Sequence, residues 1–70
     1  MLDLTGKAAV VTGAGSGIGR GISLALAHAG ADLICSDIEA NRADETAAMV
    51  RDIGRKAFVP YTADYFFYKK

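Results

Sequence analysis

The sequence predicts an α/β fold in which a parallel sheet carries both of its helices on one face. Short apolar runs alternate with segments of helical periodicity, in the order β-α-β-α-β. Strands that are separated by a helix pair in parallel through right-handed crossovers. Two crossovers in the same direction place both helices on one face, so nothing in this chain is expected to cover the other face. The prediction is therefore half of a doubly wound fold.

The first strand and the first helix are predicted from an apolar run followed by helical spacing. The strand occupies residues 7–12 and ends in glycines, as a strand buried on both faces does. The helix follows at about residues 16–29, and Gly30 stands where a C-terminal cap is expected. Its predicted buried stripe consists of Ile18, Ile22, Ala25, Leu26 and Ala29.

The second strand is predicted at residues 31–36 and the second helix at about residues 41–53. Asp44 and Glu45 are expected in the first turn of this helix, and Gly54 after its end, which suits the helix dipole and a C-terminal cap. The predicted buried stripe of this helix consists of Ala43, Ala47, Val50 and Ile53.

A third, shorter strand is predicted at residues 56–61, where Pro60 indicates an end or an edge. The composition changes sharply after it. All of the aromatic residues lie near the C-terminus: Phe58, Tyr61, Tyr65, Phe66, Phe67 and Tyr68. Residues 65–70 are therefore separated from the rest of the chain as an atypical aromatic and basic tail.

Composition and charge exclude several classes of protein. The 70 residues include 8 basic and 8 acidic side chains, and 51% are hydrophobic, which is ordinary for a globular chain and excludes an arm that binds nucleic acid through positive charge. No apolar run approaches the ~18 residues that span a bilayer, and the N-terminus lacks the apolar core of a secretory signal. The single cysteine, Cys35, excludes a disulfide framework and is expected to be a small buried hydrophobe. We expect a cytoplasmic protein without nucleic-acid or membrane partners.

A glycine-rich turn follows the first strand and carries the chemistry. It fits the spacing T-G-x-x-x-G-x-G through Thr12, Gly13, Gly17 and Gly19, whereas G-x-G-x-x-G matches in no register. Gly13 permits the tight turn off the strand, Gly17 lets the backbone approach a pyrophosphate, and Gly19 lets the helix pack close to the sheet. The N-terminus of the helix offers N–H groups and a partial positive charge to the phosphates.

The candidate site includes other residues of the same turn. The Thr12 hydroxyl is expected to tie the loop, Ser16 and Ile18 lie between the glycines, and Arg20 is expected either to face the pyrophosphate or to be an exposed helix residue. The alternative is a glycine-rich turn that merely connects strand to helix. Five glycines within nine residues are more than such a turn requires; they stand at positions 13, 15, 17, 19 and 21.

Asp37 is the second marker of a dinucleotide site. It ends the second strand 18 positions after Gly19, near the ~20-residue offset of an acid that binds the adenosine ribose. Its carboxylate is expected to accept hydrogen bonds from the ribose hydroxyls and to repel a 2′-phosphate. Asp37 can alternatively be an N-cap or turn aspartate, and the two roles can coexist. Ala14, Ser16 and Ile38 supply no cation for a 2′-phosphate, so NAD is favoured over NADP.

At this point the sequence resembles a known family. Leu4-Thr5-Gly6-Lys7, the first strand, the turn at residues 12–19 and Ser36-Asp37 are similar to the start of a short-chain dehydrogenase/reductase. The resemblance covers residues 2 to about 64. It implies a Rossmann fold and an NAD(P)-dependent oxidoreductase acting on an alcohol or carbonyl substrate, with a parent enzyme that is a homo-oligomer.

The resemblance also implies a domain boundary and one more site residue. Residues 1–64 correspond to the N-terminal half of an NAD(P)-binding Rossmann domain. Asp64 stands where the family places an acid that hydrogen-bonds the adenine amino group, although a solvated loop carboxylate is an equal alternative. The family continues with a small aliphatic residue and a Ser or Thr, whereas Tyr65 and Phe66 follow here.

The catalytic residues of the family, an Asn, a Ser and a Tyr-x-x-x-Lys pair, lie beyond this length. Tyr65 and Lys69 have the pair's spacing, but they directly follow the third strand, and the nearest preceding serine is Ser36. We therefore predict no catalytic residue and no metal ligand in this chain, and we interpret residues 65–70 as a foreign end from a truncation, a frameshift or a predicted open reading frame. A stand-alone nucleotide-binding or interaction module without chemistry is the alternative to the cofactor-binding part of an oxidoreductase.

Overall fold

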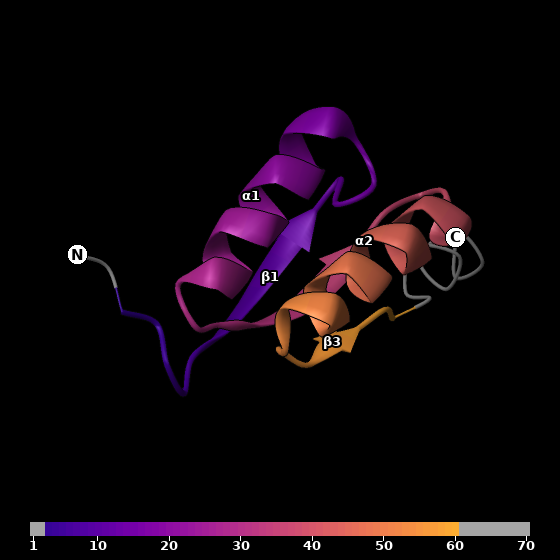
Figure 1. The fold of residues 1–70 in the computed structure, drawn as a ribbon. Helices are drawn as coiled ribbons and strands as arrows, with labels where there is room; N and C mark the ends of the chain where they lie inside the picture. Colours follow the sequence, from indigo (N-terminus) through magenta and orange to yellow (C-terminus); the bar gives the residue numbers. More distant parts are fainter. Residues whose placement is uncertain (1–2, 61–70) are drawn as a thin grey trace.

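The computed structural model describes residues 3–60 and contains five elements (Figure 1). In chain order they are β1 (Ala8–Thr12), α1 (Gly17–His28), β2 (Asp32–Ser36), α2 (Ala40–Ile53) and β3 (Ala57–Phe58). The order β-α-β-α-β is the predicted one, and the ends of the first four elements lie within one residue of the predicted positions. β3 is shorter than predicted, and Tyr61, its predicted last residue, lies outside the described residues.

The three strands form one parallel sheet in the order β1-β2-β3. Val10 of β1 pairs with Ile34 of β2, which in turn pairs with Phe58 of β3. Because side chains alternate along a strand, these three residues form a row on one face of the sheet. Val11, Leu33 and Cys35 point to the other face and are buried.

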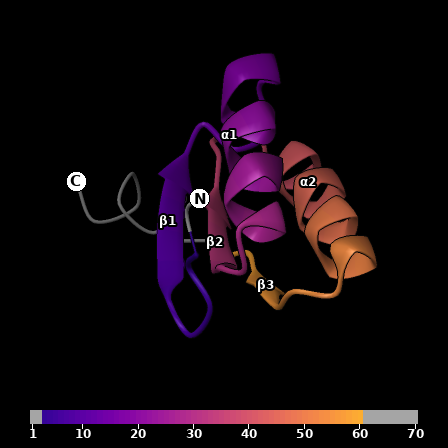
Figure 2. The ribbon, with the colours of Figure 1, turned by 60° about the vertical axis from the view of Figure 1, so that its left-hand side comes forward.

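Both helices cover the face with the buried side chains, and in the side view the opposite face carries no helix among residues 3–60 (Figure 2). Val10 is 65% exposed and Phe58 is 63% exposed on that opposite face. The predicted arrangement, a partial Rossmann-like α/β fold with both helices on one face, is therefore confirmed. We call the row Val10, Ile34 and Phe58 the bare sheet face.

The predicted buried stripe of α1 is wrong in its N-terminal half. Ile18 is 81% exposed and Ile22 is 49% exposed, and Ala25 is exposed as well, whereas the buried residues are Gly19, Ser23 and Ala27. These three small residues are spaced by four, so they lie on one helix face. The helix approaches the rest of the protein too closely there for large side chains.

The other residues of the two predicted buried stripes are half-buried or fully buried. Leu26 and Ala29 are half-buried, and Ala43, Ala47 and Val50 of α2 are fully buried. Ile53 is half-buried and packs against the core. Thr46 of α2 is also fully buried, which the apolar pattern did not predict.

The helix ends differ in one respect from the predictions. α2 begins at Ala40, so Asp44 and Glu45 lie beyond its first turn, and Glu39 is the N-cap residue. Gly54 caps the end of α2 with a φ of 100°, and Gly30 follows α1 with a φ of 108°, as predicted. None of the helices within residues 3–60 has the length and apolarity that a bilayer crossing requires.

Candidate cofactor-binding site

The glycine loop lies at the carboxyl ends of β1 and β2, where parallel sheets of this kind bind ligands. Gly13 directly follows β1 and has a φ of 66°, a backbone conformation that favours glycine. A Cβ on Gly19 would collide with the carbonyl group of Gly13. The close approach that was predicted for Gly19 is therefore present, but it is made to the loop itself.

The space beside Gly17 is open. A Cβ added at Gly17 would meet no heavy atom within 4 Å, and the neighbouring Ile18 is exposed. Gly17 begins α1, so the first backbone N–H groups of the helix have no acceptor within it and carry the positive end of its dipole. This end of α1 has the room and the donors that a pyrophosphate requires.

Ser16 fastens the loop to the helix. Its Oγ donates to the Gly13 carbonyl oxygen at 2.7 Å and accepts from the Gly19 N–H at 3.1 Å, which makes it the N-cap of α1. The loop tie that was expected of Thr12 is thus made by Ser16. Thr12 is exposed at the end of β1, and its hydroxyl makes no hydrogen bond within residues 3–60.

Asp37 is held directly against the glycine loop. Its Oδ2 accepts the Gly15 N–H at 2.9 Å, and its Oδ1 accepts the Glu39 N–H at 2.9 Å. The N-cap alternative is wrong, because the cap of α2 is Glu39, but Asp37 does make a turn through that N–H. The Glu39 N–H holds the pKa of Asp37 below its usual value; burial opposes this with the next largest effect, and the Gly15 N–H and the charge of Arg42 add smaller lowering effects.

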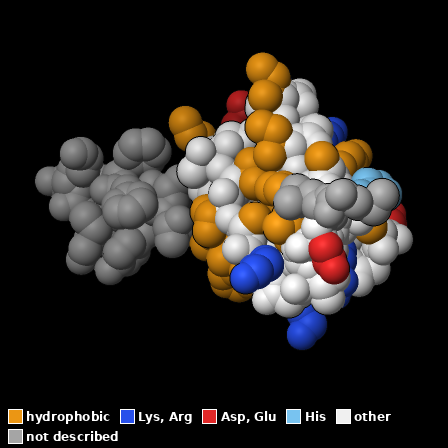
Figure 3. All heavy atoms as spheres, turned by 90° about the vertical axis from the view of Figure 1, so that its left-hand side faces the viewer, with side chains coloured by type: hydrophobic (Ala, Val, Ile, Leu, Met, Phe, Trp, Pro, Cys, Tyr) orange, Lys and Arg blue, Asp and Glu red, His pale blue; other side chains and the backbone are white. Residues whose placement is uncertain are grey.

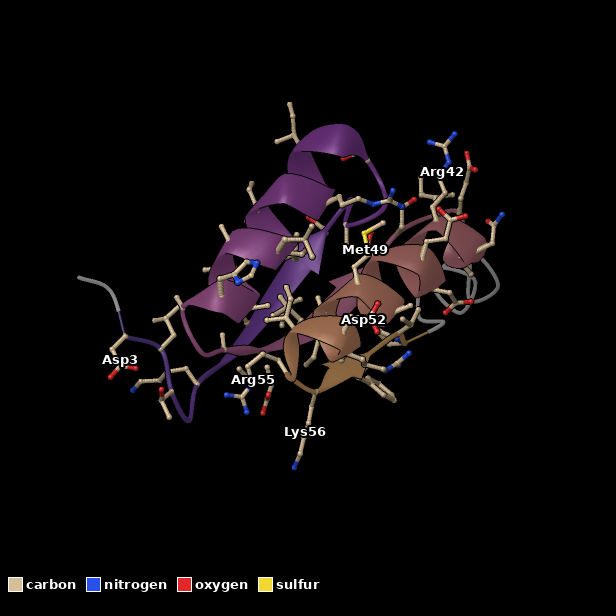
Figure 4. The ribbon with its side chains drawn as sticks, viewed as in Figure 1. Asp3, Arg42, Met49, Asp52, Arg55 and Lys56 are labelled. Carbon is tan, nitrogen blue, oxygen red and sulfur yellow. The ribbon has the colours of Figure 1, made fainter. Side chains whose placement is uncertain are left out.

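Arg42 is a cation that sequence reasoning did not place at this site. A Cβ on Gly15 would collide with the Cβ of Arg42, so the start of α2 packs directly on the loop. Arg42 projects from α2 at the end of the molecule that holds the loop (Figure 4), and its Nε lies 3.3 Å from the Glu39 Oε1. Arg42 is not adjacent to either motif in the sequence, but the fold brings its charge close enough to lower the pKa of Asp37.

Arg20 is half-buried and its guanidinium group is bonded to α2. Its Nε donates to the Thr46 Oγ1 at 2.9 Å, and its Nη2 forms an ion pair with the Glu45 Oε1 at 3.0 Å. Thr46 in turn donates to the Ala14 carbonyl oxygen at 2.9 Å. The expectation of an exposed helix residue is therefore wrong, because α2 lies beside α1 and binds the guanidinium group, whereas a contact of Arg20 with a pyrophosphate stays a prediction.

The other predicted residues lie away from this site or outside the described chain. Cys35 is fully buried, as predicted, and burial raises the pKa of its thiol. Asp64, Tyr65 and Lys69 lie outside the described residues.

The short chain dehydrogenase family matches residues 7–66 of this chain. The chain belongs to that family. The match includes the glycine loop, Asp37 and all five elements, so the predicted resemblance is confirmed.

Individual relatives agree with the family assignment. The 7α-hydroxysteroid dehydrogenase of Escherichia coli K12 is 44% identical over 57 residues, which are 81% of this chain and 22% of that protein. A structure of a 7α-hydroxysteroid dehydrogenase complexed with NADH and 7-oxo glycochenodeoxycholic acid has a TM-score of 0.79 at 41% identity, over 83% of this chain and 23% of the other. Carveol dehydrogenase from Mycobacterium avium in complex with NAD has a TM-score of 0.76 at 32% identity, over 86% and 26%. The chain thus spans about a quarter of the length of the relatives that it matches.

Proposed function

We propose that this chain binds the adenosine and pyrophosphate half of NAD. In the whole protein this half-site serves an oxidoreductase that transfers a hydride between the nicotinamide and an alcohol or carbonyl substrate. The observation that carries the proposal is the open space at Gly17, beside the N-terminus of α1 and next to a carboxylate held at the end of β2.

The N-terminus of α1 would hold the pyrophosphate. The open approach to Gly17 admits the phosphate oxygens to the free N–H groups of the first turn. Ser16 and Gly13 keep the loop beside the helix, and Ile18 presents an apolar side chain next to it.

Asp37 would bind the ribose of the adenosine. Asp37 is ionised at neutral pH, as its pKa lies below the usual value, and a carboxylate has about four lone-pair sites, of which the Gly15 and Glu39 N–H groups occupy two. The remaining sites are available to ribose hydroxyls. The charge of Asp37 disfavours a 2′-phosphate, and the complexes of two similar structures with NADH and NAD support the choice of NAD.

A substitution at Gly17 tests this function. Gly17→Val places a side chain where the pyrophosphate must approach, so we expect it to weaken NAD binding about tenfold or more. Binding is measured by titration of the 70-residue chain with NAD, followed by the amide chemical shifts of residues 13–19.

Gly21→Val is the matched control. Gly21 also lies in α1 with no heavy atom within 4 Å of an added Cβ, but it is one turn further from the loop. NAD affinity that is unchanged in Gly17→Val, or reduced equally in both variants, would contradict the proposal.

A further inference from the structure

Two side chains outside the glycine motif, Thr46 and Arg20, are linked by hydrogen bonds to the backbone of the glycine loop. We propose that Thr46 and Arg20 are positioning residues that hold the loop in the conformation that accepts the pyrophosphate. The inference rests on the proposed function, because it explains how the same site is kept in shape. The residue on which both side chains act is Ala14, the central residue of the loop.

The loop has little stiffness of its own at Ala14. Gly13 and Gly15 flank this residue, and glycine restricts the backbone least of all residues. Ala14 is nevertheless fully buried, so its N–H and carbonyl groups both need partners. The N–H donates to the Ser36 carbonyl oxygen at 2.9 Å, which leaves the carbonyl group to be satisfied by another element.

Thr46 satisfies that carbonyl group from α2, 32 residues along the chain. Its side chain is fully buried, and its Oγ1 donates to the Ala14 carbonyl oxygen at 2.9 Å. The hydrogen bonds with Ser36 and Thr46 thus hold both the N–H and the carbonyl group of Ala14. These two bonds therefore orient the peptides of Gly15 and Ser16, which lead into α1.

Arg20 sets the direction of the Thr46 hydroxyl. A guanidinium group only donates hydrogen bonds, so the Thr46 oxygen must accept from the Arg20 Nε, and its single proton is left for Ala14. Arg20 is itself held by the Glu45 carboxylate at 3.0 Å, and its Nη2 lies 3.5 Å from the Arg42 carbonyl oxygen. The chain of bonds therefore runs from the surface of α2 to the interior of the loop.

Thr46→Val and Thr46→Ser separate the hydroxyl from the packing. Valine keeps the shape of threonine without its hydroxyl, and serine keeps the hydroxyl. We expect Thr46→Val to weaken NAD binding about five- to tenfold and Thr46→Ser to bind like the unmodified chain. Both are measured by the same titration as Gly17→Val, on the 70-residue chain.

Amide hydrogen exchange without NAD tests the loop directly. In Thr46→Val we expect the amides of Ala14 and Gly15 to exchange faster, while those of Leu33 and Cys35 in β2 keep their rates. Ser23→Ala is the control, since Ser23 is a fully buried hydroxyl that bonds within α1, to the Gly19 carbonyl oxygen. Ser23→Ala removes a buried hydrogen bond in which none of residues 13–16 is a partner.

Each outcome decides the inference. Equal acceleration of loop and β2 amides in Thr46→Val, or the same loop acceleration in Ser23→Ala, would overturn it, because the effect would then be general destabilisation. Faster loop exchange in a chain that shows no NAD binding would support the inference and refute the proposed function. If Thr46→Val does not fold, Arg20→Met carries the test, because it leaves the Thr46 hydroxyl in place without its orienting donor. Unchanged loop exchange in a folded Arg20→Met would then contradict the proposal.

Discussion

Asp37 and Arg42 place opposite charges at the predicted ribose position. The Asp37 carboxylate bonds the Gly15 N–H, and Arg42 packs on the same glycine from α2. A carboxylate repels the 2′-phosphate of NADP, whereas a guanidinium group attracts it. These two charges are therefore expected to act in opposite directions on the affinity for NADP.

We predict that Asp37→Ala narrows the preference for NAD over NADP by about tenfold. The carboxylate that repels the 2′-phosphate is then absent, while the positive charge of Arg42, which acts on the position of Asp37, remains. Adding Arg42→Gln to this variant should remove the gain in NADP affinity, whereas adding Lys56→Gln, at the opposite end of the molecule (Figure 4), should not. Titration of each variant with both cofactors measures the ratio. An unmodified chain that prefers NADP would refute the prediction.

At the scale of the element, α1 is defined by how closely it approaches the loop. Gly19, Ser23 and Ala27 form its buried face, and the Ser23 hydroxyl is satisfied by the Gly19 carbonyl oxygen at 2.9 Å. Small residues allow helix backbone to approach its neighbours, and the larger apolar residues Ile18 and Ile22 then face outward. The hydrophobic pattern alone selects the larger residues for burial, which is why the predicted stripe was wrong.

Substitution of two glycines of α1 by alanine should change the free energy of unfolding in opposite directions. Gly19→Ala forces a methyl group into the Gly13 carbonyl, so we expect a loss of about 1–3 kcal/mol in the free energy of unfolding. Gly21→Ala meets open space and should gain about 0.5–1 kcal/mol, because alanine favours a helix more than glycine does. Urea unfolding at low protein concentration measures both. A Gly19→Ala variant as stable as Gly21→Ala would show that the close approach does not exist.

At the scale of the whole molecule, the sheet is covered on one side only within residues 3–60. Val10 and Phe58 lie exposed on the bare sheet face, and β1 is an edge strand. Hydrophobic side chains also gather on the side of the molecule that carries α1 and β1 (Figure 3). Exposed apolar sheet and an unpaired edge both favour association between chains.

We predict that the 70-residue chain self-associates and that Val10→Lys reduces this association. A lysine on the edge strand β1 adds charge to the bare sheet face and discourages edge pairing. Ala25→Lys is the control, because it adds the same charge to an exposed position on α1. Sedimentation at several concentrations measures the effect. A monomer that unfolds sharply and cooperatively at all concentrations would contradict the prediction.

The sequence by itself determined the element order, the parallel sheet, the glycine turn and the position of Asp37. These features depend on local periodicity and on fixed spacings between a strand, a turn and a helix. Such patterns can be recognised in the sequence without knowledge of the tertiary packing. The helix caps at Gly30 and Gly54 belong to the same class, because a backbone with positive φ restricts the residue type locally.

Only the tertiary structure decided which face of α1 is buried and which side chains surround the loop. The Gly15–Asp37 bond joins residues 22 positions apart, and the Thr46–Ala14 bond joins residues 32 positions apart. The first contact arises because β1 and β2 pair side by side, and the second because α2 lies beside α1 and packs on the loop. The spacing within the glycine motif does not predict that α2 packs on the loop. Arg42 and Thr46 could therefore be assigned to the site only from the tertiary structure.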